Sequence, residues 1–227
     1  MTHHQIIADE AELDKFISFL PEPTDTEVYY LCLFARHKYC AEFPNTKDNG
    51  QLVRVAARKE HIKEKIRKME VPLGSYSYKN GVIAPQESLA VYIGLNPRSL
   101  VKANKKLLVE LATRIADGDL NFNPISMATT AIHHAMSRKI FADFDYDEVD
   151  PADYLPVIKE TLPADSFRIL KTRGGFHLVV ELDKAPKSKW YQTLVALPNC
   201  DRRGADNLTP VPGCVQGNFV PFFVEYT

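Results

Sequence analysis

The sequence predicts an α+β protein in which an N-terminal mixed α/β module packs on a C-terminal ferredoxin-like antiparallel sheet. Apolar runs with strand-like alternation exchange with segments of helical periodicity along the chain. In the second half these segments follow a β-α-β-β-α-β order, which is typical of ferredoxin-like (RRM-like) folds. The 227 residues, of which 45% are hydrophobic, suffice to bury a large core. We therefore expect one compact unit of two modules, residues 1–124 and 125–227.

Caps and apolar runs define the first module. Asp9 is placed to cap a helix with apolar residues at helical spacing, and Ser99 is placed to cap a longer one. A dense apolar and aromatic run after the first helix predicts a buried strand. The predicted elements are a helix over 9–20, a strand over 28–34, a basic helix over 58–70, a strand over 89–95 and a helix over 99–118.

The second module has the more regular pattern. Alternating apolar residues predict its strands, and the Arg173-Gly174-Gly175 sequence predicts a tight turn between two of them. After a helix over 125–137, the predicted elements are a strand over 139–146, a helix over 151–162, strands over 167–172 and 176–182, a helix over 186–197 and a strand over 219–226. In the ferredoxin-like order, the first and third strands lie side by side in the middle of the sheet.

Composition narrows the range of functions only modestly. No apolar run approaches the roughly 18 residues that span a bilayer, and the first residues do not resemble a signal peptide. Four cysteines in a chain of this length do not form a disulfide scaffold, so we expect a cytoplasmic protein without a membrane partner. The formal net charge of −1 neither favours nor excludes nucleic-acid binding.

The most informative segment is the acidic strand near residue 144. Asp143 and Asp145 alternate with Phe144, so both carboxylates share one face of the strand. Two carboxylates on a central strand repel each other and resist burial, and a divalent cation would relieve both problems. Their hard oxygen ligands suit Mg²⁺ or Mn²⁺. The alternative is that these acids face water at the end of a strand.

The hairpin that follows has residues suited to phosphate. His177 lies near the start of the inner strand and is expected on the face that carries the two acids. Cations, a hydroxyl and glycines that allow close backbone approach are typical of phosphate-binding turns. The candidates are Lys171, Thr172, Arg173, Gly174 and Gly175. The alternatives are an ordinary hairpin turn and a core histidine with satisfied hydrogen bonds.

Together these motifs resemble the archaeo-eukaryotic primase superfamily, which includes primase-polymerases of phages and other mobile elements. The resemblance consists of the Asp143-x-Asp145 strand, the Gly175-Phe176-His177 hairpin and a third acid before a late strand, and it covers roughly residues 85–225. For the third acid we favour Asp206, with Asp201 as the alternative.

The resemblance implies a metal-dependent, template-directed nucleotidyltransferase that forms phosphodiester bonds from nucleoside triphosphates on single-stranded or primed DNA. Asp143, Asp145 and the third acid would hold two Mg²⁺ or Mn²⁺ ions without an organic cofactor, and His177 would contact the triphosphate. It also implies the cytoplasm of a bacterial or phage-infected cell, with a separate helicase or replication protein as partner.

Two other functions stay open. The first is a catalytically weak module that binds nucleotide or single-stranded nucleic acid, and Val211 favours it because an arginine is often found there in the superfamily. The second is a metal-dependent nuclease or phosphodiesterase that uses the same acids with water as the nucleophile.

Basic residues supply candidate nucleic-acid contacts, which would make affinity fall steeply with salt. The candidates are Arg58, Lys63 and Arg67 on the basic helix, and Arg98 after an Asn-Pro turn. The alternative is a solvated helix face, because glutamates dilute the positive charge of this helix.

Overall fold

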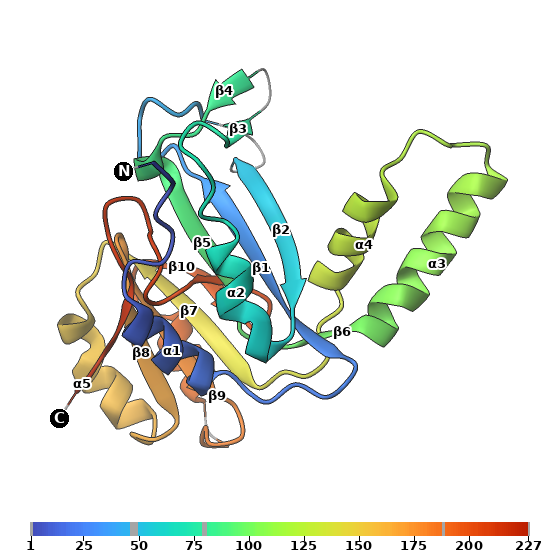
Figure 1. The fold of residues 1–227 in the computed structure, drawn as a ribbon. Helices are drawn as coiled ribbons and strands as arrows, with labels where there is room; N and C mark the ends of the chain where they lie inside the picture. The colour runs from blue at the N-terminus through green and yellow to red at the C-terminus, as the bar shows by residue number, and fades with distance from the viewer. Residues whose placement is uncertain (1, 46–49, 79–80, 188, 227) are drawn as a thin grey trace.

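The computed structural model describes residues 2–45, 50–78, 81–187 and 189–226, and it is a mixed α+β structure with antiparallel sheets (Figure 1). The first sheet has the order β11-β5-β1-β2, and β6 pairs with β1. Strand β1 is buried along its whole length, as its dense apolar run predicts. The strands of this sheet are β1 (Glu27–Ala35), β2 (Gln51–Ala57), β5 (Leu89–Gly94), β6 (Arg98–Ser99) and β11 (Leu208–Pro210).

The second sheet has the order β10-β7-β9-β8-β12. Its strands are β7 (Phe141–Asp147), β8 (Phe167–Lys171), β9 (Gly175–Glu181), β10 (Cys200–Gly204) and β12 (Phe222–Val224). As predicted, β7 and β9 are neighbours in the middle of the sheet. The prediction of the last strand over 219–226 needs correction, because β12 is shorter and lies at the far edge beside β8. On its other side, β7 pairs with β10, a charged edge strand. The sequence does not predict β10, because this segment lacks the apolar alternation typical of a strand.

Six α-helices accompany the sheets in the described part of the chain. They are α1 (Glu10–Phe19), α2 (Ile62–Arg67), α3 (Leu100–Ala116), α4 (Pro124–His133), α5 (Pro151–Thr161) and α6 (Trp190–Val195). Both predicted caps are confirmed: the backbone N–H of Glu12 donates to Asp9, and that of Lys102 donates to Ser99. The basic helix is shorter than predicted, with a 3-10 turn, η1 (Lys59–His61), before α2. None of the described helices is long and apolar enough to cross a bilayer.

Smaller elements and a projecting hairpin complete the fold. They are a two-stranded ribbon of β3 (Ser77–Tyr78) and β4 (Val82–Ile83), and a 3-10 turn, η3 (Gln86–Ser88). Helices α3 and α4 project away from the sheets (Figure 1) and pack on each other through small residues such as Ala103 and Ala131. Exposed residues on this hairpin, such as Lys105, are therefore remote from the interior of either sheet.

Two apolar clusters hold the sheets. Phe144 and Tyr146 of β7 pack with Ile158 of α5 and Leu194 of α6, so these helices cover one face of the second sheet. The larger cluster combines residues of β1, α1 and α2 with Phe141, Leu170 and Val179 of the second sheet. The face of the second sheet opposite α5 and α6 is therefore the one that packs against the first sheet and its helices.

Asn96, two residues after β5, connects the two sheets. The side-chain oxygen of Asn96 accepts hydrogen bonds from the backbone N–H groups of Ile140 and Phe141, at 2.8 and 2.9 Å. Its amide nitrogen donates to the carbonyl oxygens of Phe141 and Ala205, at 2.9 and 2.7 Å. The segment from β10 to β11 passes this point, pairing first with β7 and then with β5. Asn96 thus fixes the position of β7 relative to the first sheet.

We expect Asn96→Ala to lower the free energy of unfolding by about 3 kcal/mol, because it leaves four backbone groups without partners in a buried position. Chemical denaturation followed by circular dichroism measures this change. Asn121→Ala, at an exposed position, is the matched control and should stay within about 0.5 kcal/mol of wild type. Equal stability of the two variants would contradict the role given to Asn96.

The ion pair of the buried Glu27 with the half-exposed Arg138, near the start of β1, predicts a pH dependence of stability. Burial raises the pKa of Glu27, but hydrogen bonds from Arg138, Ser137 and Thr24 outweigh burial and lower it to about 2. The carboxylate therefore stabilises the fold fully above the pH of about 4.5 at which an unfolded glutamate titrates, and less as pH falls toward 2. We expect Glu27→Gln to lower the free energy of unfolding by about 2 kcal/mol at pH 7. In thermal unfolding at a series of pH values, this variant should lose most of the acid dependence of stability. Glu60→Gln, at an exposed position, is the control and should keep that dependence.

Candidate functional site

Strands β7 and β9 place an imidazole between two carboxylates. The strand register sets Asp145 directly opposite His177. Nδ1 of His177 lies 3.0 Å from each carboxylate oxygen of Asp143, and its Nε2 lies 3.3 Å from Oδ1 of Asp145. The alternation of side chains along each strand therefore brings all three groups to one face, as the sequence predicts.

Electrostatics fix the charge of this group. Burial alone would lower the pKa of His177, but the carboxylate of Asp143, together with Asp145 and Asp147, raises it to about 9. Burial raises the pKa of Asp145, and the positive charge of His177 opposes that effect. His177 is thus an internal counter-charge for the acids of β7.

Asp143 is enclosed by donors from two elements. Besides the imidazole, the hydroxyl of Thr209 donates to its Oδ2 at 2.9 Å, and the side-chain amide of Asn207 donates to its carbonyl oxygen at 3.1 Å. Only 3% of the residue is exposed. This geometry favours Asp143 as the residue that orients His177, in place of the metal-ligand role implied by the resemblance.

Three other acids converge instead. One carboxylate oxygen from each of Asp145, Asp147 and Asp201 lies within 4.8 Å of the other two. Asp145 and Asp147 are half-buried on β7, and Asp201 is exposed on β10. Because all of these donors are hard oxygen atoms, the acid cluster fits Mg²⁺ or Mn²⁺. Sequence reasoning overlooked Asp147, although it follows Asp145 by two residues and must share its face.

Two cations face the acid cluster from the first sheet. Arg36 and Lys38, in the turn after β1, line the same cleft as the three acids and His177. Tyr92 of β5 also lines it, and the Arg36 guanidinium lies 5.7 Å from the centre of that ring. The cleft has a volume of about 50 Å³, which suits ions and waters and leaves a larger ligand to lie across its mouth. Sequence reasoning missed both cations because they are more than 100 residues away from the acids.

Asp206, favoured as the third acid, lies apart from the acid cluster that the described residues form. Its half-exposed carboxylate forms an ion pair with the fully buried guanidinium of Arg98. Gly94 makes this position possible, because a Cβ there would lie 2.6 Å from Nη2 of Arg98. Arg98 is therefore an internal partner of Asp206 beside the sheet junction, and its burial does not suit the template contact we expected. Asp201, the alternative, is the acid that joins Asp145.

The turn predicted to bind phosphate has mostly structural contacts. Lys171 shares its strand face with Ile169, in the cluster covered by α5 and α6, and its ammonium group lies 3.3 Å from Asp150. It therefore faces away from His177. Thr172 is buried and donates its N–H to the carbonyl of Gly175. Gly175 is needed because a Cβ would lie 2.0 Å from the carbonyl oxygen of Tyr146.

The remaining turn residues lie nearer the site. A Cβ on Gly174 would lie 3.1 Å from Oδ1 of Asp147, so the glycine leaves room for that carboxylate. Arg173 instead reaches Tyr39 of the first module, to whose carbonyl oxygen Nη1 donates at 3.2 Å, and its backbone N–H donates to the side chain of Gln216 at 2.8 Å. Its guanidinium also stacks over the Tyr39 ring, 4.9 Å from the centre.

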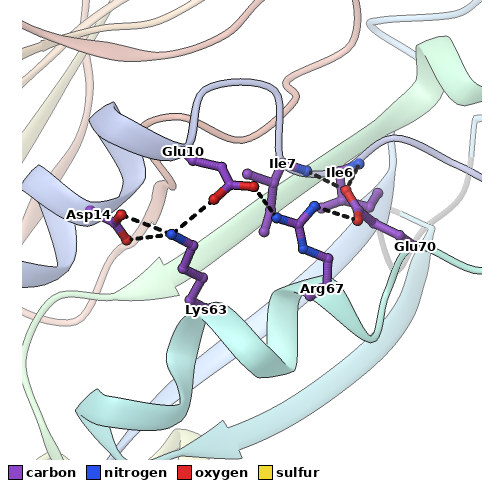
Figure 2. Close-up of polar contacts among 7 residues, drawn as sticks. All are labelled: Ile6, Ile7, Glu10, Asp14, Lys63, Arg67 and Glu70. Carbon is purple, nitrogen blue, oxygen red and sulfur yellow. Dashed lines mark hydrogen bonds and ion pairs between the residues drawn. The ribbon is translucent and has the colours of Figure 1, made fainter.

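Two cations of the basic helix form ion pairs with acids of the first helix and with Glu70 (Figure 2). Nζ of Lys63 lies 2.8 Å from Asp14 and 3.1 Å from Glu10. Arg67 pairs with Glu10 and, at 3.0 Å, with Glu70. These pairs hold α2 against α1, so the lysine and the arginine have carboxylate partners before any phosphate binds.

Arg58, the third candidate of this surface, donates to the carbonyl oxygen of Asp25 at 3.2 Å. It lies just before η1 and is exposed. The nucleic-acid contacts expected of Arg58, Lys63 and Arg67 thus stay predictions, with the two helix residues already in ion pairs.

No protein-family model, curated protein or solved structure matches the chain. The resemblance to primases accordingly depends on the motifs in the sequence. The position of His177 beside the acids is the geometric feature that bears on it most directly.

We expect His177 to titrate with a pKa near 9 in NMR spectra of the metal-free protein. Asp143→Asn should lower that pKa because it removes the largest attractive charge, whereas Asp165→Asn, at an exposed position, should not change it. Because the folded-state pKa is raised above 6.5, protonated His177 stabilises the fold fully below pH 6.5, and this contribution disappears as pH rises through about 9. A wild-type pKa below 6.5 would contradict this description.

Proposed function

We propose that this protein is a metal-dependent nucleotidyltransferase of the primase or primase-polymerase type. The observation that carries the proposal is the acid cluster of Asp145, Asp147 and Asp201 beside the imidazole of His177. Carboxylates that can hold divalent cations, next to a cation that can meet phosphate, are the groups that phosphoryl and nucleotidyl transfer requires. Nucleoside triphosphates and a single-stranded or primed DNA template are the proposed substrates.

The strand order supports a ferredoxin-like assignment of the second sheet. Counting β7, β8, β9 and β10 as strands one to four gives the order four-one-three-two, with α5 after the first strand and α6 after the third. The added strand β12 extends this sheet beyond β8. On this proposal the acids occupy the first and fourth strands, and the imidazole occupies the third.

Each group has a defined part in the proposed reaction. When bound, two divalent cations would stabilise the charge that develops on the entering and leaving oxygens of an in-line displacement. Asp145, Asp147 and Asp201 would provide their oxygen ligands. Asp143 holds Nδ1 of His177 at 3.0 Å, and Nε2, which lies 3.3 Å from Asp145, would donate to a phosphate oxygen once Asp145 binds a cation. The enclosed Asp143 and Thr209 keep this donor fixed in orientation.

The binding-only alternative loses some of its support. Val211, at the position where an arginine was considered, is fully buried in the larger apolar cluster and cannot present a side chain to the site. Arg36 and Lys38 supply cations at the cleft from another element. The acid cluster therefore has basic neighbours even though position 211 is not an arginine.

Incubation with Mn²⁺, labelled nucleoside triphosphates and a primed or unprimed template tests the proposal. Extended or new strands support a nucleotidyltransferase. Binding of nucleotide without a product would instead support the binding module, and shortened strands would support a nuclease.

Matched asparagine variants decide between the two candidates for the third acid. We expect Asp145→Asn and Asp201→Asn to reduce nucleotide incorporation at least 100-fold and to weaken Mn²⁺ binding, because each removes a charged oxygen ligand. Asp206→Asn should mainly lower stability, because it leaves the buried Arg98 without its carboxylate. Steady-state incorporation, Mn²⁺ titration and thermal unfolding measure these effects. Full loss of Mn²⁺ binding in Asp206→Asn, with Asp201→Asn unaffected, would reverse the assignment.

A further inference from the structure

The turn after β1 places two cations, Arg36 and Lys38, at the cleft that the acid cluster lines. The backbone N–H of Arg36 donates to the carbonyl of Ser88 at 2.8 Å, and that of Tyr39 donates back to Arg36 at 3.0 Å. Within this compact turn, Arg36 stacks near Tyr92, and Lys38 is exposed with its Nζ 5.5 Å from the Tyr39 ring. Within the part of the chain that the structure describes, neither side chain forms an ion pair with a carboxylate, in contrast to Lys63 and Arg67.

A hydrogen-bonded latch fixes this turn to the second sheet. The hydroxyl of Tyr39 lies 2.9 Å from that of Tyr92 and accepts from the side-chain amide of Gln216 at 2.9 Å. Gln216 in turn accepts from the backbone N–H of Arg173, whose guanidinium donates to the Tyr39 carbonyl and stacks on its ring. Tyr39 and Gln216 are buried, so the latch is part of the packed interior. The turn that carries the cations is therefore tied to the hairpin that carries His177.

The groups that line the cleft indicate the kind of ligand it can hold. Three carboxylates and the two cations of the turn line the same cleft, so a divalent cation held by the acids would lie near Arg36 and Lys38. A polyphosphate offers several phosphate groups, so that one can contact the bound cation while another contacts the basic turn.

We propose that residues 36–40 form a phosphate-binding turn, in which Arg36 and Lys38 contact the polyphosphate of a metal-bound nucleoside triphosphate and Arg173 acts as the positioning residue. This inference rests on the proposed function, because it assigns the substrate of the same acid cluster. The cations thus come from the first sheet, and the hairpin residue Arg173 acts through Tyr39.

Calorimetric titration with ATP and with inorganic tripolyphosphate, each with and without Mn²⁺, tests the turn without relying on turnover. Wild type should bind both only when Mn²⁺ is present. Arg36→Ala and Lys38→Ala should each weaken binding roughly tenfold, because each removes a charged donor, and should not weaken Mn²⁺ binding alone. Lys105→Ala, on the projecting α3, is the matched control and should bind like wild type.

The outcomes separate the two proposals. Wild-type affinity in both Arg36→Ala and Lys38→Ala, or metal-independent binding that these variants do not change, would overturn the phosphate-binding turn. Metal-dependent binding that they weaken supports it, and it does so even if no nucleotide is incorporated, in which case only the proposed nucleotidyltransferase fails.

The positioning role of Arg173 has its own readout. Arg173→Ala should raise the KM for nucleoside triphosphate several-fold more than it lowers kcat, and should shift the amide resonance of Tyr39. Arg173→Lys should recover part of the affinity, because a lysine can still donate to the Tyr39 carbonyl. An equal loss in kcat with KM unchanged, or a Tyr39 resonance that does not move, would overturn this role.

Discussion

The protonated His177 between Asp143 and Asp145 is the interaction on which the rest of the site depends. Two carboxylates on one face of a central strand repel each other, and burial adds a desolvation cost to each charge. An imidazolium on the adjacent strand offsets both effects, provided that the register places it directly opposite. A slip of one residue would turn His177 toward α5 and α6 and leave the acids without a counter-charge. The register of β7 and β9 is therefore fixed by electrostatics as well as by packing.

The site also depends on the segment from β10 to β11, which passes from the second sheet to the first. Asp201 lies on β10 and Thr209 on β11, so one short segment supplies a candidate metal ligand to the second sheet and an Asp143 partner from the first. Asn96 and the pair of Arg98 with Asp206 hold this segment where it crosses. Asp206 and Arg98, which the sequence suggested as a metal ligand and a template contact, thus hold this segment in place so that Asp201 and Thr209 can reach the site.

The sequence predicts the parts of the site that follow from local periodicity. Alternation places Asp143, Asp145 and His177 on one face, and the structure agrees because the strands are regular. Alternation also puts Lys171 on the face of the sheet opposite to His177. The prediction of a phosphate-binding turn did not take this into account, because it treated Lys171 together with Thr172 and Arg173. The choice between Asp201 and Asp206 depends on which of the two acids forms an ion pair with Arg98. In the same way, the acids that pair with Lys63 lie on a different helix. Such long-range pairings leave no local pattern in a single sequence.

The mixture of charges at the cleft argues for a site that joins a cation to an anion. In a centre that only bound a metal ion, carboxylates would raise the affinity for the ion and nearby cations would lower it. Arg36 and Lys38 would repel any divalent ion held by Asp145 and Asp147. A centre that only bound phosphate would lose from the acids for the same reason. The two sets of charges, supplied by different sheets and tied together through Tyr39, become mutually favourable when a bound cation faces the acids and a polyphosphate bridges it to the basic turn.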